Sequence, residues 1–263
     1  MRLLGPEWTV RVLSTVQESP GNITEFIDTA YLSESLREGS MSGRYAGQHA
    51  SDVVRLASLY QFGGIWLDVG AMLFVHLDQL WHQVSSPTSR FELALASADP
   101  SLMAGIAENF FIVAPKGNVF IYRWFATILE VWKGGRTNCE GLSSYPLFKH
   151  IVEGRNVGPF LHSASTAKLD YFVTYLAYER LRLLQDPHDG WSGSKYCSDK
   201  IFLVPYQEFA SAAMLTHDNG KQQFDYLVTR YDHVTQLDSP TYRQGRQFCD
   251  LVLIGFMLKI ITM

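Results

Sequence analysis

The sequence predicts an α/β fold in which a mixed sheet is flanked by helices. Short stretches rich in apolar or β-branched residues alternate along the chain with longer stretches of helical spacing, as expected for strands separated by helices. In addition, 47% of the 263 residues are hydrophobic and 18% are charged, which is enough to bury a substantial core. No internal repeat or long linker is visible, so we expect one domain over residues 1–263 with a helical C-terminal part.

The first two elements are predicted from local pattern alone. Residues 9–14 (TVRVLS) alternate and are rich in β-branched residues, which is typical of a strand. Residues 23–39 have helical spacing for much of their length and end at Gly39, so a helix is expected there.

The next predicted helix, residues 51–62, carries the first candidate site residues. Ser51 can cap it, and Asp52 in its first turn would complement the positive end of the helix dipole. Leu56 and Leu59 belong to a broad apolar face that should pack in the core. Asp52 and Arg55 are three residues apart and therefore share a helix face, as either an ordinary surface ion pair or a pair of pocket residues.

A short strand, residues 65–67 (IWL), follows the Gly63-Gly64 pair and delivers Asp68 to the edge of the sheet. Ligands of open α/β sheets collect outside the carboxyl ends of strands, so Asp68 is a candidate site residue. The alternative is that Asp68 simply begins a turn.

The rest of the chain continues the alternation. We expect strands at 109–115 and 200–205 and helices at 118–135 and 168–184. The apolar C-terminal stretch 251–263 is too short to cross a bilayer, so we expect it to form a helix packed in the core.

Composition excludes several classes of protein. The formal net charge of −4 and the lack of any run of Lys or Arg argue against a nucleic-acid partner. The three cysteines are isolated and not arranged as CxxC, which argues against a disulfide scaffold or a zinc site. No signal peptide or spanning segment is apparent, so we expect a cytoplasmic protein with a small-molecule substrate and no integral membrane segment.

The run SDVVRLASLYQFGGIWLD (51–68) resembles the sugar-binding region of DxD-type glycosyltransferases, particularly the fungal branch called capsular polysaccharide synthesis proteins. Yeast-type mannosyltransferases and clostridial toxin glucosyltransferases are related to this family. Further stretches at 109–120, 158–162, 170–181 and 188–191 also look familial. The resemblance implies a glycosyltransferase-A-like (Rossmann-like) fold, here shortened at its N-terminus because the opening strand of the family is not found. Either the sequence starts late, or the nucleotide half of the pocket is reduced.

The resemblance also implies roles for three residues. In the family, the Asp and Arg of the Ser-Asp-x-x-Arg helix hold the donor sugar, which corresponds to Asp52 and Arg55. The first carboxylate of the DxD motif corresponds to Asp68. The second, which would bind Mn²⁺ or Mg²⁺, corresponds to Gly70, so we expect no metal ligand there and weak or absent metal dependence. A basic residue such as Arg44, Lys116 or Lys195 would then stabilise the leaving diphosphate.

Four further residues are candidates for substrate binding. Asn109 precedes an apolar strand and could contribute a polar pocket group or form a turn at the strand edge. His188, Asp189 and Trp191 lie in a loop, HDGW, where relatives place late contacts to the donor or metal.

Three hypotheses about function follow. The first is an enzyme, a glycosyltransferase that uses a nucleotide-sugar donor, with Asp52, Arg55 and Asp68 shaping the donor pocket. The second is a repurposed glycosyltransferase fold that acts on a small metabolite, for example by cyclisation or dehydration in a fungal natural-product pathway. The third is a non-catalytic pseudo-glycosyltransferase.

Overall fold

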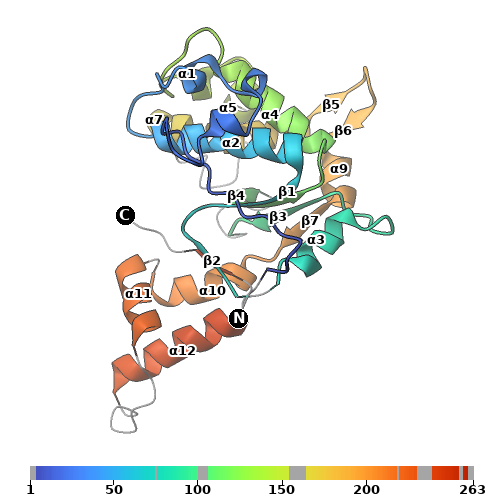
Figure 1. The fold of residues 1–263 in the computed structure, drawn as a ribbon. Coiled ribbons are helices and arrows are strands. Elements are labelled where there is room, and N and C mark those ends of the chain that lie inside the picture. The colour runs from blue at the N-terminus through green and yellow to red at the C-terminus, as the bar shows by residue number, and fades with distance from the viewer. Residues whose placement is uncertain are drawn as a thin grey trace. The chain divides into compact units, whose positions relative to one another are not determined.

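The computed structural model describes residues 4–74, 76–99, 106–153, 164–217, 219–229, 239–254 and 257–259. The chain folds into two compact units, shown together in Figure 1. Unit 1 comprises 1–8, 67–79 and 204–263, and unit 2 comprises 9–66 and 80–203. Each unit is described by itself below, and the single domain expected from the sequence stays a prediction. The familial stretch 158–162 lies outside the described residues.

A four-stranded sheet forms the centre of unit 2. Its order is β1-β4-β3-β7, with bounds β1 Gly64–Leu67, β3 Leu93–Ser97, β4 Ala107–Ala114 and β7 Ile201–Val204. The expected strands at 65–67, 109–115 and 200–205 are therefore confirmed. Together with the flanking helices, this mixed sheet confirms the predicted α/β class and is consistent with a glycosyltransferase-A-like fold.

Strands β3 and β4 are antiparallel, but their pairing is irregular. Leu95 pairs with Ile112, whereas the next residue, Ala96, pairs with Glu108. The stretch 109–111 of β4 therefore lies between two sections of regular pairing with β3. This irregularity matters for the candidate site, because Asn109 belongs to it.

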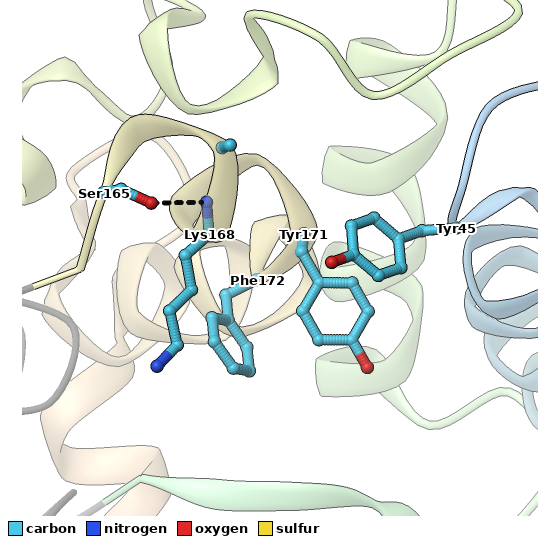
Figure 2. A pocket seen from close by; sticks show the side chains of 6 residues that line it. Tyr45, Ser165, Lys168, Tyr171 and Phe172 are labelled. Atoms are coloured by element: carbon cyan, nitrogen blue, oxygen red, sulfur yellow. Dashed lines mark hydrogen bonds between the residues drawn. The ribbon is translucent and has the colours of Figure 1, made fainter. Parts of the chain in front are cut away.

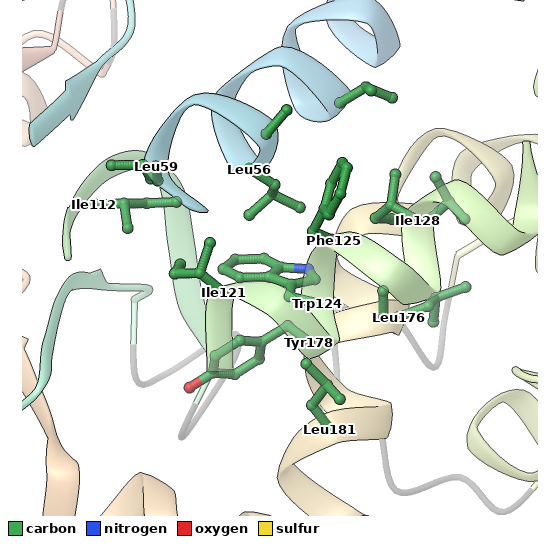
Figure 3. Close-up of a cluster of buried hydrophobic side chains, with 14 of the residues drawn as sticks. Leu56, Leu59, Ile112, Ile121, Trp124, Phe125, Ile128, Leu176, Tyr178 and Leu181 are labelled. Carbon is green, nitrogen blue, oxygen red and sulfur yellow. The ribbon is translucent and has the colours of Figure 1, made fainter. Parts of the chain in front are cut away.

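Three helices build the core of unit 2 against this sheet. Helix α4 (Val119–Val131) packs against both α2 (Ala46–Phe62) and α8 (Val173–Leu183), and α2 and α8 also contact β4. Figure 3 shows Trp124 of α4 between Leu56 of α2 and Tyr178 of α8. Leu56 and Leu59 are both buried, which confirms their predicted packing role.

Helix α2 begins earlier than the sequence indicated. It starts at Ala46, with Tyr45 at the N-cap position, so the expectation that Ser51 caps it and that Asp52 lies in its first turn was wrong. Its end is as predicted. Gly63 follows the helix with φ 70° and ψ −164°, a conformation that is essentially restricted to glycine, and its N–H donates to the carbonyl of Leu59.

The predicted helix at 118–135 is present as α4, whose start is fixed by Asn118. The Asn118 side chain accepts hydrogen bonds from the backbone N–H groups of Phe120 and Ile121 at 2.9 and 3.0 Å. The predicted helix at 168–184 is divided into α7 (Thr166–Tyr171) and α8, with Phe172 between them.

Several further elements of unit 2 were not predicted. They are η3 (Leu142–Ser144), α5 (Lys149–Glu153), the hairpin of β5 (Gln185–Asp186) with β6 (Trp191–Ser192), and α9 (Gly193–Lys200). Helix α3 (Asp78–Ser85) runs from unit 1 into unit 2.

Two expectations near the N-terminus were wrong. Residues 9–14 form no strand apart from a single bridge between Ser14 and Asn22, and Val10 and Val12 are 71% and 75% exposed. The expected helix at 23–39 is three short turns instead, η1 (Ile23–Glu25), η2 (Thr29–Tyr31) and α1 (Glu34–Arg37). The side chains of Asn22 and Asp28 accept backbone hydrogen bonds and start a new turn each time, in competition with one continuous helix.

Unit 1 consists of helices and a small sheet. Helices α10 (Gln207–Leu215), α11 (Gly220–Val228) and α12 (Pro240–Ile254) surround a core that includes Tyr226 and the fully buried Phe248. Strand β2 (Ala71–Leu73) pairs antiparallel with β8 (Met257–Lys259).

The expectation of a terminal helix over 251–263 holds for 251–254, which belong to α12, and is wrong for 257–259; residues 255–256 and 260–263 lie outside the described residues. Helix α12 ends at Ile254, and Met257 is buried in a strand because β2 provides its pairing partner. In the described part of the chain, no helix combines the length and apolar character required to traverse a bilayer.

The two glycines after α2 provide a test of how tightly this turn is built. A Cβ on Gly63 would lie 2.4 Å from the backbone nitrogen of Lys116, whereas a Cβ on Gly64 would meet nothing within 4 Å, although Gly64 also has a positive φ of 100°. We predict that Gly63→Ala lowers the free energy of unfolding by about 3 kcal/mol or more, and Gly64→Ala by about 1–3 kcal/mol. Urea unfolding of both variants checks this order, and equal losses would show that the close approach to Lys116 is not the limiting contact.

Candidate functional site

Helix α2 places three polar residues on one buried face. Asp52 and Arg55 are only 7% and 3% exposed, and His49, one turn earlier, is buried as well. The spacing of three residues brings them onto the same side of the helix, where β4 packs and Thr174 of α8 reaches Asp52. The alternative of an ordinary surface ion pair was therefore wrong, because Asp52 and Arg55 form a buried pair.

The carboxylate of Asp52 is fixed from two other elements. The Asn109 side-chain amide of β4 donates to Oδ1 at 3.0 Å, and the Thr174 hydroxyl of α8 donates to Oδ2 at 2.6 Å. Arg55 Nη1 lies 3.4 Å from Oδ1. Each carboxylate oxygen thus has at least one partner, which offsets the cost of burying the charge.

The guanidinium of Arg55 is held just as closely. Its Nη1 donates to the backbone carbonyl of Asn109 at 2.7 Å, and its Nη2 donates to the Ser51 hydroxyl at 3.1 Å. It also lies over the ring of Trp66, with 5.5 Å from Cζ to the ring centroid. Asn109 therefore contacts both charged residues, one through its side chain and the other through its backbone.

A hydrogen bond between Tyr175 and Glu108 lies next to this network. The Tyr175 hydroxyl donates to Glu108 Oε2, and the neighbouring residues Thr174 and Asn109 are the partners of Asp52. Burial, followed by the negative charge of Glu108, holds the pKa of Tyr175 well above its usual value, so this phenol stays protonated and acts as a donor. Asp52 raises that pKa further, whereas Arg55 lowers it.

His49 is a member of this cluster that the sequence reasoning missed. Its Nδ1 lies 3.7 Å from Asp52 Oδ2, and its ring contacts Trp132 and Tyr171 with centroid distances of 5.4 and 6.2 Å. Neither ring nitrogen makes a hydrogen bond with any residue that the structure describes. The spacing that paired Asp52 with Arg55 could have identified His49, three residues earlier. Thr174, in contrast, is 122 residues away from Asp52 and no local pattern points to it.

Asp68 follows β1 directly, as predicted, and belongs to unit 1, whereas Asp52 belongs to unit 2. The Asp68 side chain is half-buried, and its backbone carbonyl accepts a hydrogen bond from Ala71 N–H at 2.9 Å, which closes a tight turn into β2. The roles of all the candidate site residues stay predictions.

The turn after β1 does not provide a two-carboxylate metal site. Gly70 occupies the position of the second carboxylate and has no side chain. Across the described ranges, the side chains of His, Cys, Asp and Glu form no group of three that could hold a metal ion. Among the described residues, this turn therefore lacks the second carboxylate that the DxD motif would offer to a metal.

The HDGW loop joins β5 to β6 and is tied to α4. Arg123 of α4 forms an ion pair with Asp189, lies 3.5 Å from Asp186 and covers the ring of Trp191 at 4.6 Å. Trp191 also stacks on Tyr196 at 4.8 Å between centroids. His188 is exposed, and its backbone N–H donates to Asp186. The structure thus joins Asp189 and Trp191 in one cluster around Arg123, while Asp52, Arg55 and Asn109 form another.

Comparison with known proteins shows a similarity to glycosyltransferases. Residues 4–87, which include Asp52, Arg55 and Asp68, match the family described as "Glycosyltransferase sugar-binding region containing DXD motif". The O-glycosyltransferase braB of Annulohypoxylon truncatum is 34% identical over 88% of this chain and 56% of its own length. The glycosyltransferase afumC of Aspergillus fumigatus is 36% identical over 86% of this chain and 59% of its own. The O-glycosyltransferase PaGT of Phomopsis amygdali is 34% identical over 98% and 64%.

The predicted resemblance is therefore confirmed: residues 4–87 match this family, and most of the chain is similar to proteins named glycosyltransferases. It spans between 56% and 64% of the length of these three relatives. No solved structure matches the chain significantly.

The hydrogen bond from Thr174 to Asp52 can be tested without changing side-chain volume. Thr174→Val replaces the hydroxyl with a methyl group and leaves a buried carboxylate oxygen with one partner fewer. We predict a loss of about 1.5–3 kcal/mol in the free energy of unfolding, measured with urea, and a smaller loss for Thr174→Ser, which keeps the hydroxyl.

Thr127→Val is the matched control for the loss of a threonine hydroxyl. The Thr127 hydroxyl donates to the carbonyl of Arg123 within α4, so Thr127→Val removes a neutral hydrogen bond that no buried charge requires. A Thr174→Val protein as stable as the Thr127→Val protein would show that the Asp52 carboxylate does not depend on α8.

Proposed function

We propose that the protein is a glycosyltransferase that transfers a sugar from a nucleotide-sugar donor to an acceptor hydroxyl, with weak or no dependence on a metal ion. The observation that carries this proposal is the buried Asp52–Arg55 pair, which lies within the stretch that matches the sugar-binding family. Two of the relatives are named O-glycosyltransferases, which supports an oxygen acceptor.

The chemistry of the pair suits a sugar. A carboxylate accepts and a guanidinium donates, so together they can bind two neighbouring hydroxyls of one ring. Their positions are set before any ligand arrives, since Asn109, Thr174 and Ser51 already fix both groups. Preorganisation of this kind lowers the entropic cost of binding.

Asp68 is proposed as the second contact to the donor. It stands at the carboxyl end of β1, where α/β folds bind ligands, and the turn through Gly70 lets the backbone approach a bound group closely. Asn109, His188, Asp189 and Trp191 remain proposed substrate-binding residues. Among them, Asn109 has the strongest support because it touches both members of the buried pair.

The test of this function is a thermal-shift screen of nucleotide sugars. A ligand that binds only the folded protein raises its melting temperature by mass action. We predict that at least one nucleotide sugar does so, that Asp68→Asn and Asp68→Ala fold normally, and that both reduce the shift, with Ala having the larger effect because it removes shape as well as charge. If no nucleotide sugar raises the melting temperature, the repurposed or non-catalytic hypothesis is favoured. A full shift in a well-folded Asp68→Ala protein would show that this carboxylate has no part in donor binding.

Metal dependence gives an independent prediction. Because Gly70 provides no ligand, Mn²⁺ should change nucleotide-sugar binding little, and EDTA should leave turnover largely intact. Gly70→Asp would restore the two-carboxylate pattern and should increase the effect of Mn²⁺ on binding. Strong inhibition of the unaltered protein by EDTA would contradict this expectation.

A further inference from the structure

A surface cavity of about 350 Å³, half-open to solvent, lies where α7 and the start of α2 come together in unit 2. Its described walls include Tyr45, Tyr171, Phe172 and Lys168. Figure 2 shows Lys168 and Phe172 extending from the same turn, with Tyr45 reaching in from another element. The size falls within the range of small-molecule sites.

The aromatic walls of the cavity are in mutual contact. The rings of Tyr45 and Tyr171 are 4.4 Å apart between centroids, and those of Tyr171 and Phe172 are 4.9 Å apart. Their faces and edges can hold a flat ring in offset or edge-to-face contact. Lys168 supplies a positive charge within the lining, and Arg44 adds a second next to Tyr45, with 5.4 Å from Cζ to the ring centroid. A small aromatic compound with an acidic oxygen complements this combination of rings and cations.

The cavity and the candidate donor pair lie along one face of α2, with the buried ring of His49 between them. Tyr45, His49 and Asp52 follow each other at spacings of four and three residues, and the His49 ring contacts both Tyr171 and the neighbourhood of the Asp52 carboxylate. Tyr45 and Asp52 are seven positions apart in sequence, a distance of roughly 10 Å along the helix axis. A ligand in the cavity would therefore lie within about two helical turns of the residues proposed to hold the sugar.

From this arrangement we propose that the cavity is the acceptor site and that it takes an aromatic hydroxy acid. The acceptor role rests on the proposed transferase function. The binding of an aromatic acid to the cavity does not, and it can be measured without any donor. The ring lies against Tyr171 and Phe172, and the acidic group pairs with Lys168. The acceptor oxygen forms the new bond to the sugar, the nucleoside diphosphate leaves with the electron pair of the broken sugar–oxygen bond, and the proton of the acceptor hydroxyl passes to the departing diphosphate or to water.

The first experiment measures binding of para-hydroxybenzoate to the full chain in the absence of nucleotide sugars, by ligand-observed NMR titration. The methyl ester of the same compound is the uncharged control. We expect the acid to bind more tightly than the ester, and Lys168→Met to weaken the acid roughly three- to fivefold while leaving the ester unchanged. Tyr45→Ala should weaken both compounds, because it removes one ring of the wall.

Lys149→Met is the matched control for the loss of a lysine. Lys149 is an exposed residue of α5 that interacts with Glu153, so its removal should alter neither ligand. Equal binding of acid and ester, equal effects of Lys149→Met and Lys168→Met, or no binding of the acid would each overturn the proposed site.

The second experiment tests the acceptor role with the nucleotide sugar that gives the largest thermal shift. A sugar-bearing product of para-hydroxybenzoate is expected by mass spectrometry, with Lys168→Met raising KM for the acid and leaving kcat and the nucleotide-sugar KM unchanged. Binding of the acid without any product would overturn the acceptor role. If no nucleotide sugar gives a shift, the proposed function fails, while the binding experiment still decides whether the cavity takes an aromatic acid.

Discussion

The buried pair of Asp52 and Arg55 is the constraint around which unit 2 is arranged. A charge pair out of contact with water is stable only if further hydrogen bonds satisfy both groups, and removal of one partner of such a pair typically costs about 3–5 kcal/mol. Here the additional partners come from β4, from α8 and from α2 itself. Two helices and a strand must therefore meet at fixed positions. The same contacts give the proposed sugar-binding groups a defined geometry before a donor binds.

Residues with local signals were predicted well. The glycine stop after α2, the strand that follows it, the helix beginning at Asn118 and the packing of Leu56 and Leu59 all depend on neighbours within a few residues. The stretch 9–14 shows the limit of such signals. Its alternating pattern is that of a strand, but strand formation also requires a pairing edge, and the described structure gives it only one bridge.

In the candidate site, too, features that depend on nearby residues were predicted and features that depend on tertiary packing were not. Asp52 and Arg55 were found because they are close in sequence and match a family pattern, yet their burial was not apparent, since it depends on β4 and α8. Thr174 could not have been found at all, because its hydrogen bond to Asp52 is a product of tertiary packing. The strand β8 was missed for a related reason, since the apolar C-terminal stretch resembles a helix until β2 is present as a partner.

The irregular pairing of β4 makes the site sensitive to the number of residues in the stretch 109–111. In the 109–111 stretch, the Asn109 carbonyl accepts a hydrogen bond from Arg55, and its side-chain amide donates one to Asp52. Both hydrogen bonds are made where the regular pairing of β4 with β3 is interrupted. Strand residues face alternate sides, so adding or deleting a single residue here would reverse the direction in which Asn109 points. Substitutions of the apolar side chains in this stretch should therefore disturb the site less than an insertion or a deletion. In a sequence alignment, the length of the stretch would indicate an intact site better than the identity of its apolar residues.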